Sequence, residues 1–305
     1  MRRWVLVLIA GVTGCGGESG AEAAGEEVRA DVAGEATFQA SCSVASPSTP
    51  LPDELRETSG LAQSRRDPEL FWTHNDGNGA ELFGIGADGS IIQRVEIPGT
   101  EFDDWEDVEA GACASGTCLF LADIGDNDGE RENITVYRIP EPAAGARASA
   151  SPVALRARYP ERAQDAEALI VSDVGEIYIV TKGRTGPIRL YQLPIPTAEG
   201  VATLELVEEL MPEPENDRDR ITAGTLSRDG RWVGIRSYTN LYLYEAASFF
   251  SSSADQPQVI DLSAARQENG ESLVISAEGS IWVTSEAGGD DSSPEWARFE
   301  CDLGR

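Results

Sequence analysis

From residue 55 onward, short apolar stretches alternate with turns rich in Gly, Asp, Asn and Pro. Apolar and polar residues alternate within most of these stretches, which is typical of β-strands with one buried face. Clear examples are ELFWTHND at 69–76, CLFLADIG at 118–125 and EIYIVTKG at 176–183. No long stretch shows the period of an amphipathic helix. The pattern therefore predicts an all-β protein.

The predicted strands fall into groups of four that repeat about every 50 residues, which is typical of a β-propeller. The fifth group ends one strand short at the C-terminus, and the strand-like segment 36–44 can supply the missing strand. We therefore predict a five-bladed β-propeller over residues 36–305, with four antiparallel strands per blade and the last blade closed by an N-terminal strand. The alternative is a pair of β-sandwiches, which would impose no common register on the groups.

A common register does link the five groups. In each group the first strand runs into a turn that begins with Ser or Gly, and a hydrogen-bonding side chain stands five residues before that position. The first strands of propeller blades line the central tunnel, so side chains at one level converge on the axis. The register favours the propeller over the sandwiches and predicts an axial ring. The ring consists of Ser59, Glu106, Glu167, Thr222 and Glu271.

Three carboxylates on one axis repel one another unless they take up protons or bind a cation. Together with the two hydroxyl groups, the ring glutamates offer hard oxygen ligands. Ca²⁺ accepts such ligands in a loose geometry, whereas Mg²⁺ requires a tighter octahedron. We therefore predict a Ca²⁺ site on the axis, with Mg²⁺ as second choice. The alternative is a wet tunnel lined by polar residues without an ion.

The five-blade count and the Ser–Glu–Glu–Thr–Glu ring resemble the calcium-activated apyrases. Members of that family are five-bladed propellers with Ser, Glu, Glu, Ser and Glu around an axial Ca²⁺. The resemblance covers residues 55–300 in plan and only the ring in detail, and Thr222 stands where the family has Ser. It implies calcium binding and nucleotide hydrolysis. The segments HNDGN, DWEDVEA and DIGDN also resemble a group of bacterial exported propeller proteins.

The turns after the second strands lie on the same face as the ring and form the mouth of the tunnel. A mouth with acids on one side and Lys and Arg on the other can hold an anion that is bridged to the central cation. The alternative is that HNDG and DIGDND are Asx-type turns, in which Asp and Asn cap their own backbone. The catalytic candidates at the mouth are His74, Asp76 and Asp123. The ligand-binding candidates are Trp105, Asp126, Asn127, Lys182, Arg184, Arg236 and Tyr238, with Asp103, Asp104, Asp165, Ser285 and Glu286 beside them.

The N-terminus has the pattern of an export signal. Met1–Arg3 is basic, an apolar run follows, and the sequence VTGC at 12–15 resembles a bacterial lipobox. We predict a lipoprotein signal peptide at 1–14, then an acylated Cys15 and a disordered acidic tether at 15–35. Gly16 after the acylated Cys implies the outer membrane, so we expect a lipid-anchored protein of the bacterial cell envelope. The alternative is an ordinary signal peptide that contains a Cys.

Four further cysteines fit an oxidising compartment. They allow three pairings, and their spacing favours Cys113–Cys118 across a short turn and Cys42–Cys301 between the two ends of the folded part. The alternative is a thiolate cluster that binds a metal. Trp72, Trp232 and Trp282 stand in second strands, where we expect core packing between blades rather than sugar-stacking platforms.

The formal net charge of -29 excludes nucleic acid as a partner, because phosphate binding requires Lys and Arg on one face. A single His excludes metal sites built from several His. We expect a monomeric module that binds a small anionic ligand or a protein partner at the mouth. The first alternative is a Ca²⁺-dependent phosphoester or nucleotide hydrolase in which His74 or an Asp activates water. The second is a glycosidase that uses two mouth carboxylates.

Overall fold

The computed structural model describes residues 39–77, 79–114, 116–194, 200–251, 256–288 and 292–304. These residues belong to one compact unit, 38–305. The predicted signal peptide, Cys15 and the tether lie outside the described residues. Among the described helices, none is both long and apolar enough to cross a membrane.

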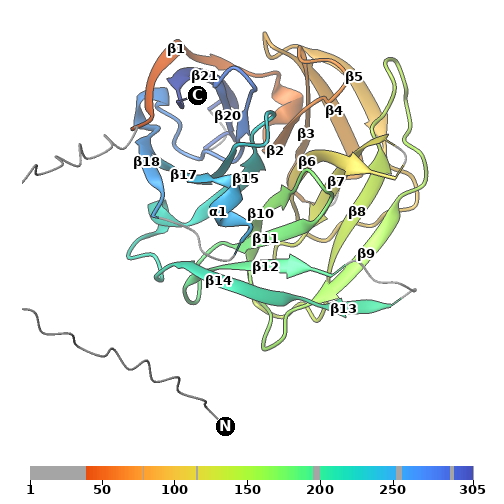
Figure 1. Ribbon diagram of the computed structural model, residues 1–305. Coiled ribbons are helices and arrows are strands. Elements are labelled where there is room, and N and C mark those ends of the chain that lie inside the picture. Colours follow the sequence, from red (N-terminus) through yellow and green to blue (C-terminus); the bar gives the residue numbers. More distant parts are fainter. Residues whose placement is uncertain are drawn as a thin grey trace, which may run out of the picture. The chain divides into compact units, whose positions relative to one another are not determined.

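Five sheets stand around a common axis (Figure 1), and their first strands contact one another in the closed order β2, β6, β10, β15, β19 and back to β2. Blade one contains β2 (Thr58–Gln63), β3 (Leu70–Asn75), β4 (Glu81–Gly86) and β5 (Ile91–Glu96). Blade two contains β6 (Trp105–Cys113), β7 (Gly116–Asp123), β8 (Ile134–Pro140) and β9 (Val153–Arg158). Blade three contains β10 (Ala166–Val171), β11 (Ile177–Thr181), β12 (Ile188–Leu193) and β14 (Glu205–Met211). The predicted propeller is confirmed.

The last two blades complete the ring. Blade four contains β15 (Ile221–Leu226), β16 (Trp232–Ser237), β17 (Asn240–Glu245) and β18 (Gln258–Asp261), with the short helix α1 (Ala246–Phe249) after β17. Blade five contains β19 (Val274–Ile275), β20 (Ile281–Ser285), β21 (Glu295–Asp302) and β1 (Ser41–Pro50). One strand was not predicted: β13 (Val201–Thr203) leaves the blade-three segment and pairs in parallel with β9 at the outer edge of blade two.

The N-terminal strand closes the ring as predicted. In Figure 1, β1 and β21 lie side by side although they come from opposite ends of the chain. Cys42 faces Cys301 across this pair, and the two residues form a disulfide. The described strand spans Ser41–Pro50, so it extends beyond the predicted segment toward blade one. The second predicted disulfide, Cys113–Cys118, is also present.

The core lies between neighbouring blades. The inner strands β10, β15 and β16 are buried along their whole length, whereas the outer strand β5 alternates between more and less exposed residues. Each inner strand is covered by a blade on both faces, so it carries apolar residues on both sides. Trp72, Trp232 and Trp282 are all buried in the apolar clusters between blades, as predicted.

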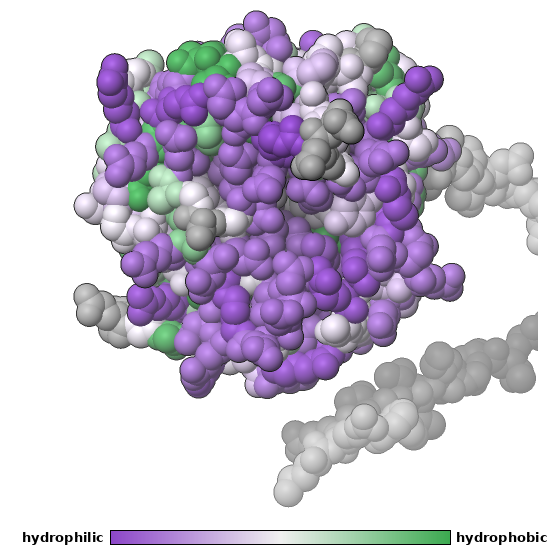
Figure 2. Space-filling model, turned by 180° about the vertical axis from the view of Figure 1, so that it is seen from behind, coloured by the Kyte–Doolittle hydropathy of each residue, from purple (hydrophilic) through white to green (hydrophobic). Residues whose placement is uncertain are grey.

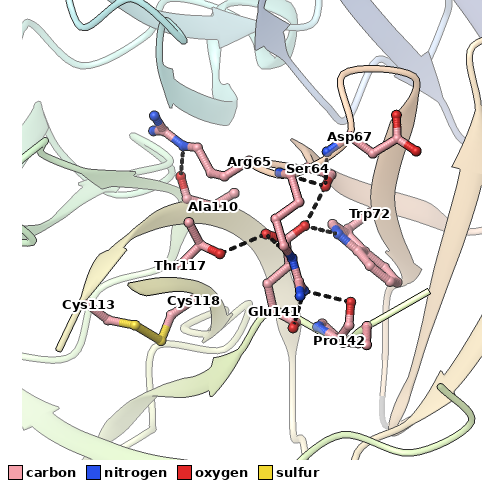
Figure 3. A network of polar contacts seen from close by, with 12 residues as sticks. Ser64, Arg65, Asp67, Trp72, Ala110, Cys113, Thr117, Cys118, Glu141 and Pro142 are labelled. Atoms are coloured by element: carbon pink, nitrogen blue, oxygen red, sulfur yellow. Dashed lines mark hydrogen bonds and ion pairs between the residues drawn. A yellow bond between two sulfur atoms is a disulfide. The ribbon is translucent and has the colours of Figure 1, made fainter. Parts of the chain in front are cut away.

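Glu141 joins blades one and two at the face opposite the mouth (Figure 3). Its Oε1 accepts hydrogen bonds from Ser64 Oγ and from Trp72 Nε1 at 3.2 Å, and its Oε2 accepts one from Thr117 Oγ1 at 3.1 Å. Thr117 lies in the hairpin that Cys113 and Cys118 bracket. This disulfide therefore supports a structural contact between blades, and the buried carboxylate is satisfied by several donors.

We expect the ring-closing disulfide to contribute much more stability than the hairpin disulfide. A crosslink restricts the unfolded chain more when it closes a longer loop, and the sequence separations are 259 and 5 residues. Loop-closure entropy then gives about 5.5 kcal/mol for Cys42–Cys301 and about 2 kcal/mol for Cys113–Cys118. Urea unfolding of the two double Cys→Ser variants measures both values. Equal losses would contradict this order.

Candidate metal centre

Backbone irregularities stand at the ring positions. The pairing of each inner hairpin shifts register at Glu106 between β6 and β7, at Glu167 between β10 and β11, and at Thr222 between β15 and β16. In blade one the shift begins directly after Ser59. A β-bulge re-aims the side chain of the extra residue. The repeated bulge therefore turns the ring side chains away from the ordinary alternation of the strand.

In blade five the first strand is shorter than predicted, and Glu271 precedes it. Arg236 explains the difference, because its Nη1 donates to the backbone oxygens of Ser272 at 2.6 Å and Thr284 at 2.9 Å. These carbonyls are thereby engaged by a side chain instead of a regular ladder. The Glu271 N–H still bonds to the Thr284 oxygen at 3.1 Å, which holds Glu271 at the axis.

A cavity of about 110 Å³ opens at the mouth of the tunnel. Its lining is almost entirely polar, and it includes four of the five predicted ring residues. Thr222 is not among the lining residues, because its Oγ1 donates to the Gly270 oxygen of the next blade at 2.7 Å. We therefore leave Thr222 out of the candidate centre. The lining residues are Ser59, Asp76, Glu106, Asn127, Glu167, Lys182, Tyr238, Glu271 and Glu286.

Burial and mutual repulsion make the ionised form of the carboxyl groups in this cavity unfavourable. Burial raises the pKa of Glu106 and of Glu271 well above the usual range, and repulsion from Glu167 raises both further. Burial also raises the pKa of Glu167, and the nearby Lys182 ammonium opposes that rise. Lys182 Nζ donates to Glu167 Oε1 in a buried ion pair. One ammonium thus faces three converging glutamates.

Two groups of carboxylates are close enough to share a cation. Ligand oxygens of Glu106, Asp165 and Glu167 lie within 4.8 Å of one another, and the same holds for Asp76, Asp104 and Glu106. Glu106 belongs to both groups. Burial, with the charges of Asp76 and Asp165, raises the pKa of Asp104 to about 6. Asp104 and Asp165 were predicted as rim residues, and the structure brings them to the ring itself.

Gly125 explains part of the DIGDN segment. A Cβ atom at this position would lie 2.1 Å from Glu106 Oε1 and 2.6 Å from the Asp104 carboxyl carbon. Only a residue without a side chain leaves room for both carboxylates at the mouth. The glycine therefore belongs to the centre, although sequence reasoning treated it as part of a turn.

His74 and Trp105 were predicted at the rim, but both lie in the interior. Neither side chain is exposed, and the two rings stack with centroids 3.9 Å apart. Burial lowers the pKa of His74 to about 3, so its imidazole is neutral, and Nδ1 lies 3.0 Å from the Asn75 oxygen. His74 pairs with Ser59 where β2 bulges, and a Cβ atom on Gly60 would lie 2.9 Å from its Nε2. The bulge therefore directs the histidine between blades one and two.

Arg236 was also predicted at the mouth, and its guanidinium is instead buried in blade five. Besides its two backbone acceptors, Nη2 donates to Gln267 Oε1 at 2.9 Å. Gly270 makes room for this group, because any Cβ there would collide with Nη2. Arg236 is therefore a structural residue of the interior, while Tyr238, two positions later, does line the cavity.

The remaining rim candidates mostly satisfy local hydrogen bonds. Asp123 accepts the N–H groups of Asp103 and Asp104 and pairs with Arg131 at 2.9 Å. Asp126 accepts the N–H groups of Glu130 and Arg131 at 2.9 and 3.0 Å. The bonds of Asp126 are local capping of the kind that the alternative interpretation described, whereas Asp123 caps a turn distant in sequence. Arg184 bonds to Asp165 at 2.7 Å and to the Asn127 side chain.

Sequence reasoning missed Asp107, which links three blades inside the tunnel. Its carboxylate is buried and accepts the N–H groups of Val108 at 2.8 Å, Leu169 at 2.8 Å and Gly224 at 3.4 Å. These donors belong to blades two, three and four. Burial raises the Asp107 pKa, and the three N–H bonds hold the carboxyl group in place. Asp107 directly follows the ring residue Glu106, and the sequence alone does not show that the two acids have different roles.

Another buried acid lies toward the opposite end of the tunnel. Glu109 Oε1 accepts the Ala110 N–H at 3.1 Å, while Oε2 has no hydrogen-bond partner among the described residues. Burial raises the pKa of Glu109 to about 8, and the cationic Arg65 opposes the rise. The tunnel therefore holds carboxyl groups at three levels.

Comparison with known proteins shows the fold alone. No family model matches the chain, and no curated protein matches it in sequence. The structure is similar to a PQQ-bound aldose sugar dehydrogenase from Streptomyces coelicolor, with 10% identity, a TM-score of 0.50, and coverage of 87% of this chain and 99% of that chain. A gluconolactonase from Xanthomonas campestris has 11% identity, a TM-score of 0.43, and coverage of 82% and 88%. The likeness shows the propeller architecture, and the structures named here are not specifically apyrases.

We expect Asp107→Ala to destabilise the propeller by about 3 kcal/mol or more, because it leaves buried N–H groups of three blades without an acceptor. The control is Asp103→Ala in the same segment, whose side chain is 82% exposed and whose loss should change stability by less than about 0.5 kcal/mol. Urea unfolding of both variants gives the comparison. A change as small as that of the control would show that the three bonds contribute little.

We expect Glu109→Gln to stabilise the protein at neutral and alkaline pH. The pKa of Glu109 in the folded protein, about 8, lies above that of an ordinary glutamate. The protonated Glu109 therefore contributes fully to the free energy of unfolding below about pH 4.3, and this contribution is lost as the pH rises through 8. The glutamine does not titrate, so the variant should gain about 4–5 kcal/mol at pH 8 and nothing at pH 4. Unfolding curves at both pH values test this, with exposed Glu278→Gln as control. A pH-independent difference would contradict it.

Proposed function

We propose that the protein is a cation-binding β-propeller that presents its mouth to a ligand or a protein partner. The observation that carries the proposal is the cavity at the mouth, in which five carboxylates from four blades face a single ammonium group. Buried like charges favour binding of a cation, because a cation removes both their repulsion and their desolvation penalty. The carboxylates are those of Asp76, Glu106, Glu167, Glu271 and Glu286.

The donor atoms fit Ca²⁺, with Mg²⁺ as second choice. Glu106, Glu167 and Asp165 would hold the ion, and the Ser59 hydroxyl oxygen lies in the same lining. The described lining contains no Cys and no His, so the site has none of the ligands that zinc, copper or iron prefer. Carboxylate and hydroxyl oxygens in a loose arrangement match the requirements of Ca²⁺.

The basic residues of the mouth favour a binding role over phosphoester hydrolysis. Lys182 is paired with Glu167, Arg184 with Asp165, and Arg236 with backbone oxygens in the interior. A nucleotide hydrolase of the apyrase type needs such cations to hold phosphate. The cavity of about 110 Å³ is also smaller than the roughly 300–1,000 Å³ of small-molecule sites. It suits an ion with water better than a nucleotide or a sugar.

The proposal also covers the oligomeric state of the propeller and its attachment to the membrane. Hydrophilic residues cover most of the face seen in Figure 2. Among the described residues, the exposed apolar side chains Ile92, Val153 and Val259 lie on outer strands of three different blades, so these three do not form one apolar patch of the kind that marks an interface. We propose a monomer with its acidic surface in water. The lipobox-like sequence VTGC at 12–15 and Gly16 support the further proposal that lipid on Cys15 anchors it to the bacterial cell envelope, at the outer membrane.

We expect Ca²⁺ to raise the melting temperature and a chelator to lower it, because a ligand that binds the folded state stabilises it by about 2.7 kcal/mol at a hundred times its Kd. Glu167→Gln should abolish the effect of Ca²⁺, whereas Glu209→Gln, on the outer strand of the same blade, should retain it. A melting temperature that a chelator leaves unchanged would favour the alternative, a water-filled polar tunnel without a bound ion. Phosphate release from nucleoside di- and triphosphates, measured in parallel, would establish the hydrolase instead.

A further inference from the structure

Lys182 places its ammonium group inside the candidate metal centre. It is the only lysine of the chain, its side chain is buried, and its Nζ donates to Glu167 Oε1. It lines the same cavity as Glu106 and Glu271. An alkylammonium ion therefore stands where the proposed divalent cation would bind.

The backbone of Lys182 is fixed while its side chain can move. Its N–H donates to the Asp165 oxygen at 2.9 Å, and its own oxygen accepts the Ile221 N–H at 3.1 Å. These bonds hold the start of the side chain between blades three and four. A lysine side chain has a flexible stem of four carbons that ends in a compact ammonium group. Rotation about the bonds of this stem can therefore move the ammonium away from Glu167 without a change in the fold.

The charge of Lys182 acts on every acid of the cavity. Burial raises the pKa of each of these carboxyl groups, and the Lys182 ammonium opposes that rise in all of them. The groups concerned are Asp76, Glu106, Glu167, Glu271 and Glu286. Lys182 is thus the common counter-charge of the centre, which is the role that a bound metal ion would otherwise have.

We propose, resting on the cation site proposed above, that Lys182 is a tethered competitor of the divalent cation: its ammonium neutralises Glu167 in the cation-free protein and leaves the ring when the cation binds. A dication bound to Glu167 repels an ammonium bonded to the same carboxylate, so the two do not coexist there. Asp76 and Glu286 line the same cavity and can receive the displaced ammonium.

This competition predicts selectivity for charge. A monovalent ion that displaces the ammonium exchanges one positive charge for another and gains little. A divalent ion adds one positive charge at the ring glutamates that the ammonium leaves, and so gains Coulomb energy there. The tethered ammonium also raises the cation concentration at which the ring fills. Lys182 therefore sets both the affinity and the preference for divalent ions.

The first test is titration of the full-length protein with calcium chloride by calorimetry. Lys182→Met keeps the length of the side chain and removes the charge, and it should bind Ca²⁺ about ten-fold more tightly or better. Arg189→Met is the control, because it removes one positive charge from the same blade at the exposed pair with Glu209. Its affinity should stay within about two-fold of the wild type.

The outcomes separate the competitor from the site itself. Equal Ca²⁺ affinities of the wild type and Lys182→Met overturn the competitor and leave the cation site standing. If neither protein binds Ca²⁺, the cation site is overturned and the competitor with it.

The second test needs no variant and so does not depend on how Lys182→Met folds. Coupling between two sites is reciprocal, so Ca²⁺ must weaken the Lys182–Glu167 pair as much as the pair weakens Ca²⁺ binding. Because the chain has a single lysine, acylation by an amine-reactive reagent, followed by mass spectrometry of its peptide, reports on this one ammonium. Ca²⁺ should increase the labelling rate several-fold. An unchanged or reduced rate would overturn the proposal.

Discussion

The central constraint on this molecule is that the first strands of its blades meet at the axis with strand edges that no further strand covers. Backbone groups on these edges are buried, so each requires a hydrogen-bond partner from a side chain. Asp107 supplies acceptors to blades three and four, while Ser59 and Thr222 donate to the backbone oxygens of the following blades. The tunnel is polar because closing the ring demands it. The same convergence brings the glutamates together and creates the electrostatic problem that a cation resolves.

Much of the architecture could be predicted because it follows from periodicity. The residue five positions before the turn that ends each first strand identified the ring position in each blade. The incomplete fifth group indicated that an N-terminal strand, β1, closes the last blade. Cysteine spacing was sufficient for both disulfides. The strand β13 could not be foreseen, because a three-residue parallel pairing at an outer edge has no pattern of its own in the sequence.

The directions of side chains were less predictable than their positions. His74, Trp105 and Arg236 lie close to the ring along the chain, as expected, yet all three are buried between blades or within one. Bulges beside them explain the first two, because a bulge changes the direction in which neighbouring side chains point. For Arg236 the decisive feature is the open space at Gly270, which is distant in sequence. The sequence of a single segment predicts neither a bulge nor the space that a residue distant in the chain leaves open.

The disulfide at the start of β1 also determines how the domain responds to mechanical load. Any tension on the N-terminal segment enters the folded part at Ser41, and Cys42 is the next residue. A strand pulled from its end normally detaches one hydrogen bond at a time, which requires little force. Here the load passes at once through a covalent bond into β21, before the β1–β21 ladder is stretched. The ring is therefore protected against peeling at the one strand by which it is closed.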